Sequence, residues 1–257
     1  MLPRALIAAA LLVAAVEIPA EAQIRVAPRP FPRAPRFHAA INAGMQDIKP
    51  FTETQTFDQY FEEGSFTLTR TMNRPVFYDG SIGVTVWRGL EVIGAFSFLT
   101  NTGPGELTAS VPHPLMFSKP RSVTGEVSTV QRREMGYHID LGWRVTATPK
   151  LEFTAFGGPS VFMVDQVLVT GLRLGLANEV FPFDTLAFPG VDTESQTQTV
   201  TGYNAGVDMT WRFTRAFGVG LLLRYTAGKK DFTPPDGQPI EVEVGGLQAG
   251  GGIRVVF

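Results

Sequence analysis

The sequence predicts an all-β protein, an antiparallel up-and-down β-barrel that spans a membrane. Three observations predict this fold. Several segments alternate between apolar and polar residues, the connections between them are short and long in turn, and the last such segment ends on the C-terminal Phe257. Alternation places successive side chains on opposite faces of a strand, so one face can meet lipid while the other lines a polar lumen.

The composition is compatible with this class but does not decide it. Of the 257 residues, 44% are hydrophobic and 18% are charged, with 27 Gly, 20 Phe and no Cys. Without Cys there is neither a disulfide nor thiolate chemistry. The formal net charge of −2 gives no global field that would favour nucleic acid. A soluble all-β protein would share much of this composition.

The first 22 residues have the pattern of a signal peptide. Arg4 provides a short positive region, residues 5–16 form an apolar run too short to span a bilayer as a helix, and a small-x-small motif ends at Ala22. We therefore expect export with cleavage after Ala22. The alternative, an uncleaved N-terminal anchor, is disfavoured because Pro19 would break a helix there.

The mature chain is expected to have two parts. Residues 23–36 are rich in Pro and Arg and lack periodicity, which indicates an extended periplasmic tether. Residues 37–257 form the barrel domain.

Strands are expected where the alternation is clear. In residues 135–146, Tyr137 and Ile139 share one parity, and His138 and Asp140 share the other. The eight expected strands cover residues 37–47, 77–87, 90–100, 135–146, 151–169, 201–213, 217–225 and 241–257.

The connections predict the topology. Short turns at residues 88–89, 147–150 and 214–215 alternate with long connections at residues 101–129, 172–198 and 227–240. Outer-membrane barrels combine tight periplasmic turns with long external loops in this way. The pattern gives an even number of strands with both ends of the barrel domain on the side of the short turns.

Residues 48–75 leave the strand number open. Segments 54–61 and 65–71 form a hairpin pattern around Gly64. We interpret this hairpin as the first external loop, rising above the membrane, which gives eight strands. If both segments crossed the membrane, the barrel would have ten strands. The apolar face of residues 54–61 is thin, which favours eight.

Aromatic residues mark one membrane interface. Trp143 and Trp211 come directly before short turns, and Phe257 ends the chain on the same side. Aromatic rings concentrate at membrane interfaces, so we expect these three residues to be interface aromatics. Trp87 also precedes a short turn, but it shares parity with Thr85, which indicates an inward position for its ring.

These features together resemble the small bacterial outer-membrane β-barrel family, which includes the transmembrane domain of outer membrane protein A and similar porin-like proteins. The resemblance covers residues 37–257 and rests on pattern, not on a residue-specific motif. It implies a bacterial outer-membrane location, contact with outer-membrane lipid, and recognition of the last strand by the barrel assembly machinery. Ile253, Val255 and Phe257 would form that assembly signal.

Charged residues of both signs fall at inward positions of the expected strands. Charges on an inward face must pair or stay hydrated. The expected lumen network consists of Asp140, Arg144, Glu152, Asp208, Arg212, Arg224 and Arg254. One interpretation is a polar plug of interlocked arginines and carboxylates, because an eight-stranded barrel is just wide enough for side chains to fill it. The other is a narrow conductive path in which Arg144, Arg212 and Arg254 form a ring that favours anions.

The function that follows is a structural or passive porin-like role in the outer membrane. One alternative is surface binding through loops, because the connection 172–198 carries Phe181, Phe183, Leu186 and Phe188, which could also fold back onto the barrel.

The other alternative is a lipid A-modifying barrel enzyme. Only His38, His113 and His138 are available as a base, and no spacing matches a nucleophile motif. We expect no cofactor, no metal site and no nucleic-acid partner, because the three His are scattered and the basic residues form no groove with interleaved aromatics. The sequence leaves the oligomeric state open.

Overall fold

The structure is a computed structural model that describes residues 37–48, 51–70, 74–174, 180–188, 190–232 and 240–257. The barrel belongs to one compact unit, Pro35–Phe257. The expected signal peptide with its cleavage after Ala22, and the expected tether, lie outside the described residues. No helix among the residues described is long and apolar enough to cross a membrane.

The described residues form ten antiparallel strands. They are β1 (Phe37–Asp47), β2 (Phe51–Gln59), β3 (Glu62–Arg70), β4 (Val76–Trp87), β5 (Leu90–Val111), β6 (Arg121–Thr148), β7 (Leu151–Leu172), β8 (Val191–Arg212), β9 (Phe217–Phe232) and β10 (Ile240–Val256).

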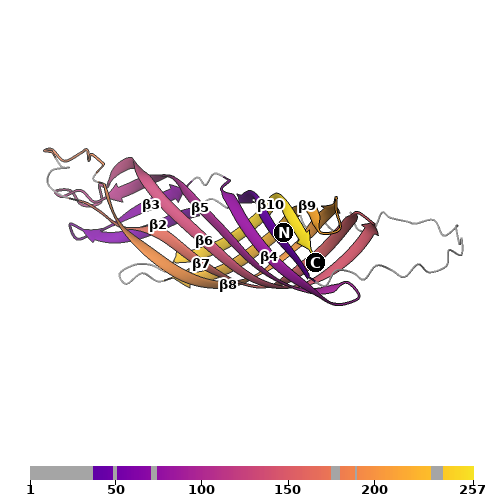
Figure 1. Ribbon diagram of the computed structural model, residues 1–257. Coiled ribbons are helices and arrows are strands. Elements are labelled where there is room, and N and C mark those ends of the chain that lie inside the picture. The colour runs from indigo at the N-terminus through magenta and orange to yellow at the C-terminus, as the bar shows by residue number, and fades with distance from the viewer. Residues whose placement is uncertain (1–36, 49–50, 71–73, 175–179, 189, 233–239) are drawn as a thin grey trace, which may run out of the picture. The chain divides into compact units, whose positions relative to one another are not determined.

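Eight of these strands close into a ring, as the sequence predicts. The hydrogen-bonded order β5-β4-β1-β10-β9-β8-β7-β6 returns to its start because β5 also pairs with β6 (Figure 1). β1 and β10 seal the ring in a register that runs from His38↔Val256 to Asp47↔Leu247. The expectation of an all-β, eight-stranded up-and-down barrel is therefore confirmed.

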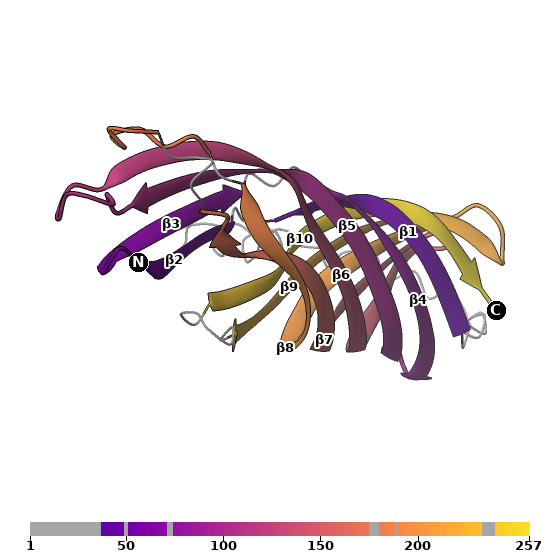
Figure 2. The same ribbon diagram turned by 90° about the vertical axis from the view of Figure 1, so that its left-hand side faces the viewer.

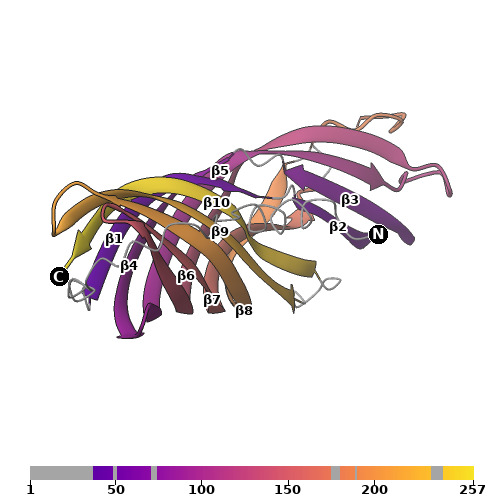
Figure 3. The ribbon, with the colours of Figure 1, turned by 90° about the vertical axis from the view of Figure 1, so that its right-hand side faces the viewer.

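The hairpin β2–β3 lies outside the ring. β5 is long enough to have two neighbours on the same side: its first half pairs with β4, up to Phe77↔Leu99, and its second half pairs with β3, from Arg70↔Gly105 to Ser65↔Ser110. Figures 2 and 3 show the hairpin beside the outer part of β5, beyond the end of the ring. The hairpin is thus an external element, and the ten-stranded alternative is wrong.

Strands extend into each of the long connections, which corrects the expectation that these segments are loops throughout. β5 runs to Val111 and β6 begins at Arg121, inside the expected loop 101–129. In the same way β8 begins at Val191 and β9 continues to Phe232. In β5 the sequence pattern concealed this because the face that carries the apolar side chains reverses along the strand.

The reversal separates two parts of the sheet. Near the short turns the outward side chains are apolar and exposed, as with Ile41 and Ile139, while inward ones are polar. In the outer part Leu68 and Leu107 face inward and are fully buried, while Thr108 faces outward and is exposed. The first pattern suits a lipid surround and the second suits water. The outer part accordingly has its own apolar core, formed by Phe66, Leu68, Leu107, Ala109, Val111, Val123, Val127, Val169 and Leu186, which we call the external core.

The aromatic residues expected at the membrane interface lie on the outer face of the ring. Trp143, Trp211 and Phe257 are exposed at the end with the short turns. Trp87 is also exposed, which corrects the inward position expected from parity. A bulge between Thr85 and Trp87 shifts the register by one residue and turns the indole outward.

Candidate functional site: the charged lumen network

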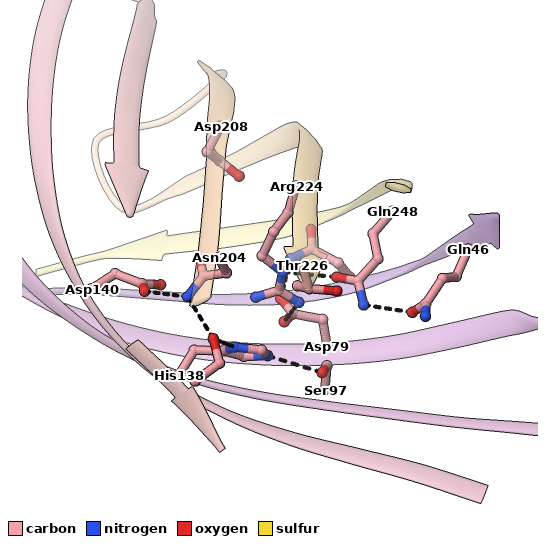
Figure 4. A network of polar contacts seen from close by, with 12 residues as sticks. Gln46, Asp79, Ser97, His138, Asp140, Asn204, Asp208, Arg224, Thr226 and Gln248 are labelled. Carbon is pink, nitrogen blue, oxygen red and sulfur yellow. Dashed lines mark hydrogen bonds and ion pairs between the residues drawn. The ribbon is translucent and has the colours of Figure 1, made fainter. Parts of the chain in front are cut away.

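The lumen holds a network of buried polar side chains centred on Arg224 (Figure 4). Even-numbered residues of β9 face inward, and this parity carries Arg224 into the lumen. Its Nη2 donates to Asp79 Oδ2 at 2.6 Å, and its Nε donates to Gln248 Oε1 at 2.7 Å. Gln248 Nε2 in turn donates to Gln46 Oε1 at 2.6 Å. These bonds join β9 to β4, β10 and β1.

A second branch starts from the same aspartate. Asn42 Nδ2 donates to Asp79 Oδ1 at 2.9 Å, and Asn42 Oδ1 accepts from Arg254 Nη1 at 2.6 Å. Arg254 also donates from Nε to Asp208 Oδ1 at 3.2 Å and forms an ion pair with Asp208 through Nη2. The network therefore extends across five neighbouring strands, from β4 through β1, β10 and β9 to β8.

The opposite wall carries a chain of uncharged and acidic groups. Asn204 Nδ2 donates to Asp140 Oδ1 at 2.6 Å and to Ser160 Oγ at 3.0 Å. Ser160 Oγ lies 2.8 Å from His138 Nδ1, and His138 Nε2 lies 3.0 Å from Ser97 Oγ. Both imidazole nitrogens are therefore engaged inside the barrel wall.

The arginines nearest the short turns are each paired with a carboxylate. Arg144 lies 2.8 Å from Glu91 Oε1, and Arg212 lies 2.8 Å from Glu152 Oε1. Arg254 pairs with Asp208. Inward carboxylates on other strands therefore compensate each of these guanidinium groups. The structure does not present a ring of unpaired arginines that would favour anions.

Glycines on the inward face make room for these side chains. A methyl group at Gly220 would lie 2.7 Å from Arg254 Cζ and 2.7 Å from the carbonyl oxygen of Met209. A methyl group at Gly136 would lie 2.6 Å from Ser97 Oγ. Packing at this density leaves a lumen cavity of about 40 Å³, lined in part by Asn42, Asp140 and Thr154. Such a volume holds a few water molecules at most.

The structure brings most of the predicted network residues around that one cavity. Asp140, Arg144, Glu152, Asp208, Arg224 and Arg254 line it, and Arg212 joins through Glu152. Sequence reasoning missed the neutral partners that link the charges, which are Asn42, Gln46, Ser97, Ser160, Asn204 and Gln248. The sequence signal that could have identified these neutral residues is their position on the inward face of their strands.

A second polar layer lies between this network and the external core. Arg132 Nη2 donates to the carbonyl oxygen of Glu243 at 2.6 Å, and Glu134 Oε1 accepts from the backbone N–H of Gly245 at 3.1 Å. These two bonds link β6 to β10, which stand on opposite sides of the ring. They cross the lumen at its outer end.

The external hairpin is tied to β7 by buried polar groups. Gln55 Nε2 donates to the carbonyl oxygen of Val169 at 3.3 Å, and Arg70 donates to the carbonyl oxygen of Val167. Burial raises the pKa of Glu53, although the Gln55 amide and the Arg70 charge act in the opposite direction. Burial also lowers the pKa of Arg70 to about 10.

The apolar connection after β7 folds back onto the external core. Leu186 is buried within that core and Phe188 packs against it, whereas Phe181 remains exposed with its ring 5.9 Å from that of Phe183.

Among the described residues no cluster of three His, Cys, Asp or Glu side chains could hold a metal ion.

The terminal residues of the barrel meet each other. The rings of Phe37 and Phe257 stack with centroids 6.2 Å apart, and the two backbones exchange hydrogen bonds of 3.0 Å. Ile253 and Phe257 are exposed on the outer face, and Val255 shares their parity.

An eight-stranded antiparallel ring with an apolar outer face and a polar lumen defines the fold of small outer-membrane β-barrels. The fold is similar to that of the outer membrane protein OprG from Pseudomonas aeruginosa, with a TM-score of 0.52 and 8% sequence identity over 87% of this chain and 96% of that one.

Two further solved barrels show weaker similarity. Neisserial surface protein A has a TM-score of 0.41 and 11% identity over 86% of this chain and 97% of its own. The outer membrane protease OmpT from Escherichia coli has a TM-score of 0.47 and 10% identity over 86% of this chain and 97% of its own. No protein-family model and no curated protein matches the sequence.

Proposed function

We propose that this chain is a non-conducting outer-membrane barrel with a structural role, anchoring its external β-sheet at the cell surface. The observation that carries this proposal is the ion-paired network around Arg224 and Asp79, which leaves a cavity of only about 40 Å³. Breaking a buried ion pair leaves an uncompensated charge in a low-dielectric interior, which is strongly destabilising. Such a network therefore resists opening. A structural role therefore fits better than a porin-like one.

The outer-membrane location is supported by the outer face of the ring. Its exposed side chains near the short turns are apolar, and Trp87, Trp143 and Trp211 gather at that end. Tyr78 and Tyr203 are exposed farther along their strands, as expected for aromatic girdles at two interfaces. Ile253, Val255 and Phe257 would then serve as the signal for the barrel assembly machinery.

Conductance tests the proposal. We expect the refolded protein in a planar lipid bilayer to show no stable current steps. The double variant Asp79→Ala with Arg224→Ala should produce small, intermittent steps, because it removes two side chains that cross the lumen. Ile139→Ala, on the outer face, serves as the control. Stable and uniform current steps in the wild type would rule out a plugged barrel.

A second candidate function, surface binding, is favoured by one observation. The turn between β5 and β6 exposes Leu115, Met116 and Phe117, and Phe181 is exposed on the neighbouring connection. Exposed apolar side chains on external tips are typical of contact surfaces. If Phe117→Ser with Phe181→Ser lowers adhesion of cells to an epithelial layer while the current record stays unchanged, binding is supported. Unchanged adhesion would argue against it.

The lipid-modifying enzyme is not supported by the histidines. His113 Nδ1 accepts hydrogen bonds from the backbone N–H groups of Leu115 and Met116, each 3.1 Å long, so it stabilises the β5–β6 turn. His138 is buried in the lumen, and His38 lies 2.6 Å from Arg144 Nη2.

A further inference from the structure

A row of polar side chains crosses the outer face of three strands where the apolar surface ends. In the strand register, Arg133 of β6 lies opposite Asp165 of β7, and Asp165 lies opposite Thr197 of β8. The next outward pairs toward the short turns are Met135↔Met163 and Tyr137↔Val161. The row therefore lies at the level where lipid chains give way to headgroups, if the apolar belt is embedded in a membrane.

The surface is hollowed at this row. A depression of about 300 Å³ is lined by Gln131, Arg133, Asp165, Val167, Ser195 and Thr197. Thr197 Oγ1 donates to Asp165 Oδ1 at 2.6 Å, which fixes one wall. The lining offers a guanidinium, hydroxyls, an amide and a carboxylate around one apolar side chain.

Arg133 differs from the other exposed cations of the outer part. Lys119, Arg173 and Lys229 each form an ion pair with an acidic side chain, at 2.8, 2.7 and 2.6 Å. Lys230 donates to the carbonyl oxygen of Thr199 at 3.0 Å. Arg133 is exposed, and its side chain has no hydrogen bond or ion pair within the part of the chain that the structure describes. Its five donors are therefore free for a ligand.

We propose that this depression binds the phosphorylated saccharide headgroup of an outer-leaflet lipid. The guanidinium of Arg133 matches a phosphate in planar, bidentate geometry. Ser195, Thr197 and Gln131 offer hydrogen bonds to sugar hydroxyls. Asp165 accepts from a hydroxyl but repels a bare anion, so the set suits a sugar phosphate better than inorganic phosphate. This inference rests on the proposed outer-membrane location.

Native mass spectrometry of the full chain in zwitterionic nanodiscs tests the site. The probes are a diphosphorylated glucosamine-disaccharide lipid, its dephosphorylated form, and inorganic phosphate. We expect the wild type to retain the phosphorylated lipid preferentially. Arg133→Gln should weaken retention about tenfold, the loss expected for one charge-assisted contact. Ser195→Trp, which fills the depression without changing charge, should weaken it as well.

Arg173→Gln is the matched control, since it removes an exposed external cation that already has a partner. Heat-dependent gel mobility confirms that each variant is folded. Equal retention by the wild type and Arg133→Gln overturns the site, and so does equal retention of both lipids. Binding of inorganic phosphate without lipid preference overturns the headgroup assignment. These outcomes concern lipid retention alone, so they are distinguishable from a stable current, which would refute the plugged barrel.

Discussion

Arg224 and Asp79 form a buried ion pair of 2.6 Å that joins β9 to β4 across the lumen, although 145 residues separate them in the chain. Two strands, β1 and β10, lie between them in the ring. Each also contacts a side chain from one of those strands, Gln248 for Arg224 and Asn42 for Asp79. The pair therefore ties together the segment of the ring where the two ends of the barrel domain meet.

We expect Asp79→Asn to destabilise the barrel by about 3–5 kcal/mol, because it leaves the guanidinium of Arg224 buried without a countercharge. Urea unfolding in lipid vesicles, followed by Trp fluorescence, measures this change. Asp58→Asn, on the exposed side of the external hairpin, should change the free energy of unfolding by less than about 0.5 kcal/mol. A shift of that small size for Asp79→Asn would contradict a stabilising role for the pair.

Gly220→Ala should destabilise the barrel by about 1–3 kcal/mol, the usual cost of overpacking. The added methyl would lie 2.7 Å from Arg254 Cζ and from a backbone oxygen that cannot move freely. Gly94→Ala is the matched control, because nothing lies within 4 Å of a methyl group at that outward position. The temperature at which the folded gel band disappears measures both variants. Equal temperatures would show that the lumen accommodates the methyl.

The ring was predictable because its signals are local. Period-two alternation identifies each strand, and a turn such as Arg88-Gly89 is recognised from a few residues. The hydrogen-bond and ion-pair partners within the lumen could not be predicted, because the stagger between strands decides which inward side chains meet across the ring. Parity places Asp79 and Arg224 inside, but nothing in their sequence positions pairs them.

The outer half of the sheet escaped prediction for a different reason. A single criterion, apolar side chains facing outward, identifies a strand in lipid and fails where the same strand enters water. Leu107 and Thr108 alternate as regularly as Ile139 and Asp140, with the opposite orientation. The inward position expected for Trp87 was wrong because a bulge adds one residue to the strand and so reverses its parity. A bulge leaves no clear mark in the sequence.

Leu107→Ala should loosen the external core while leaving the membrane part intact. Leu107 is fully buried in that core, so its truncation should cost about 2–5 kcal/mol of local stability. Hydrogen exchange is expected to accelerate in β3 and the outer part of β5, with unchanged heat resistance of the barrel on gels. Thr108→Ala on the exposed face is the control. Loss of the barrel's heat resistance together with the exchange protection of β3 and β5 would mean that the external core and the membrane part unfold as one unit.

Glu53→Gln should stabilise the external hairpin at neutral pH. Burial raises the pKa of Glu53 in the folded hairpin, so folding favours the protonated acid. That contribution is fully present below the pKa of the unfolded chain, and it is lost as pH rises through the higher folded value. Arg70 keeps its charge throughout, since its pKa of about 10 lies above this pH window.

In the wild type, protection of the β2 amides from hydrogen exchange, corrected for intrinsic exchange rates, should therefore fall between acidic and neutral pH. Glu53→Gln should flatten this profile, whereas Glu63→Gln at the exposed hairpin end should reproduce the wild-type slope. Protection that rises with pH in the wild type would show that the attraction between Glu53 and Arg70 outweighs their burial.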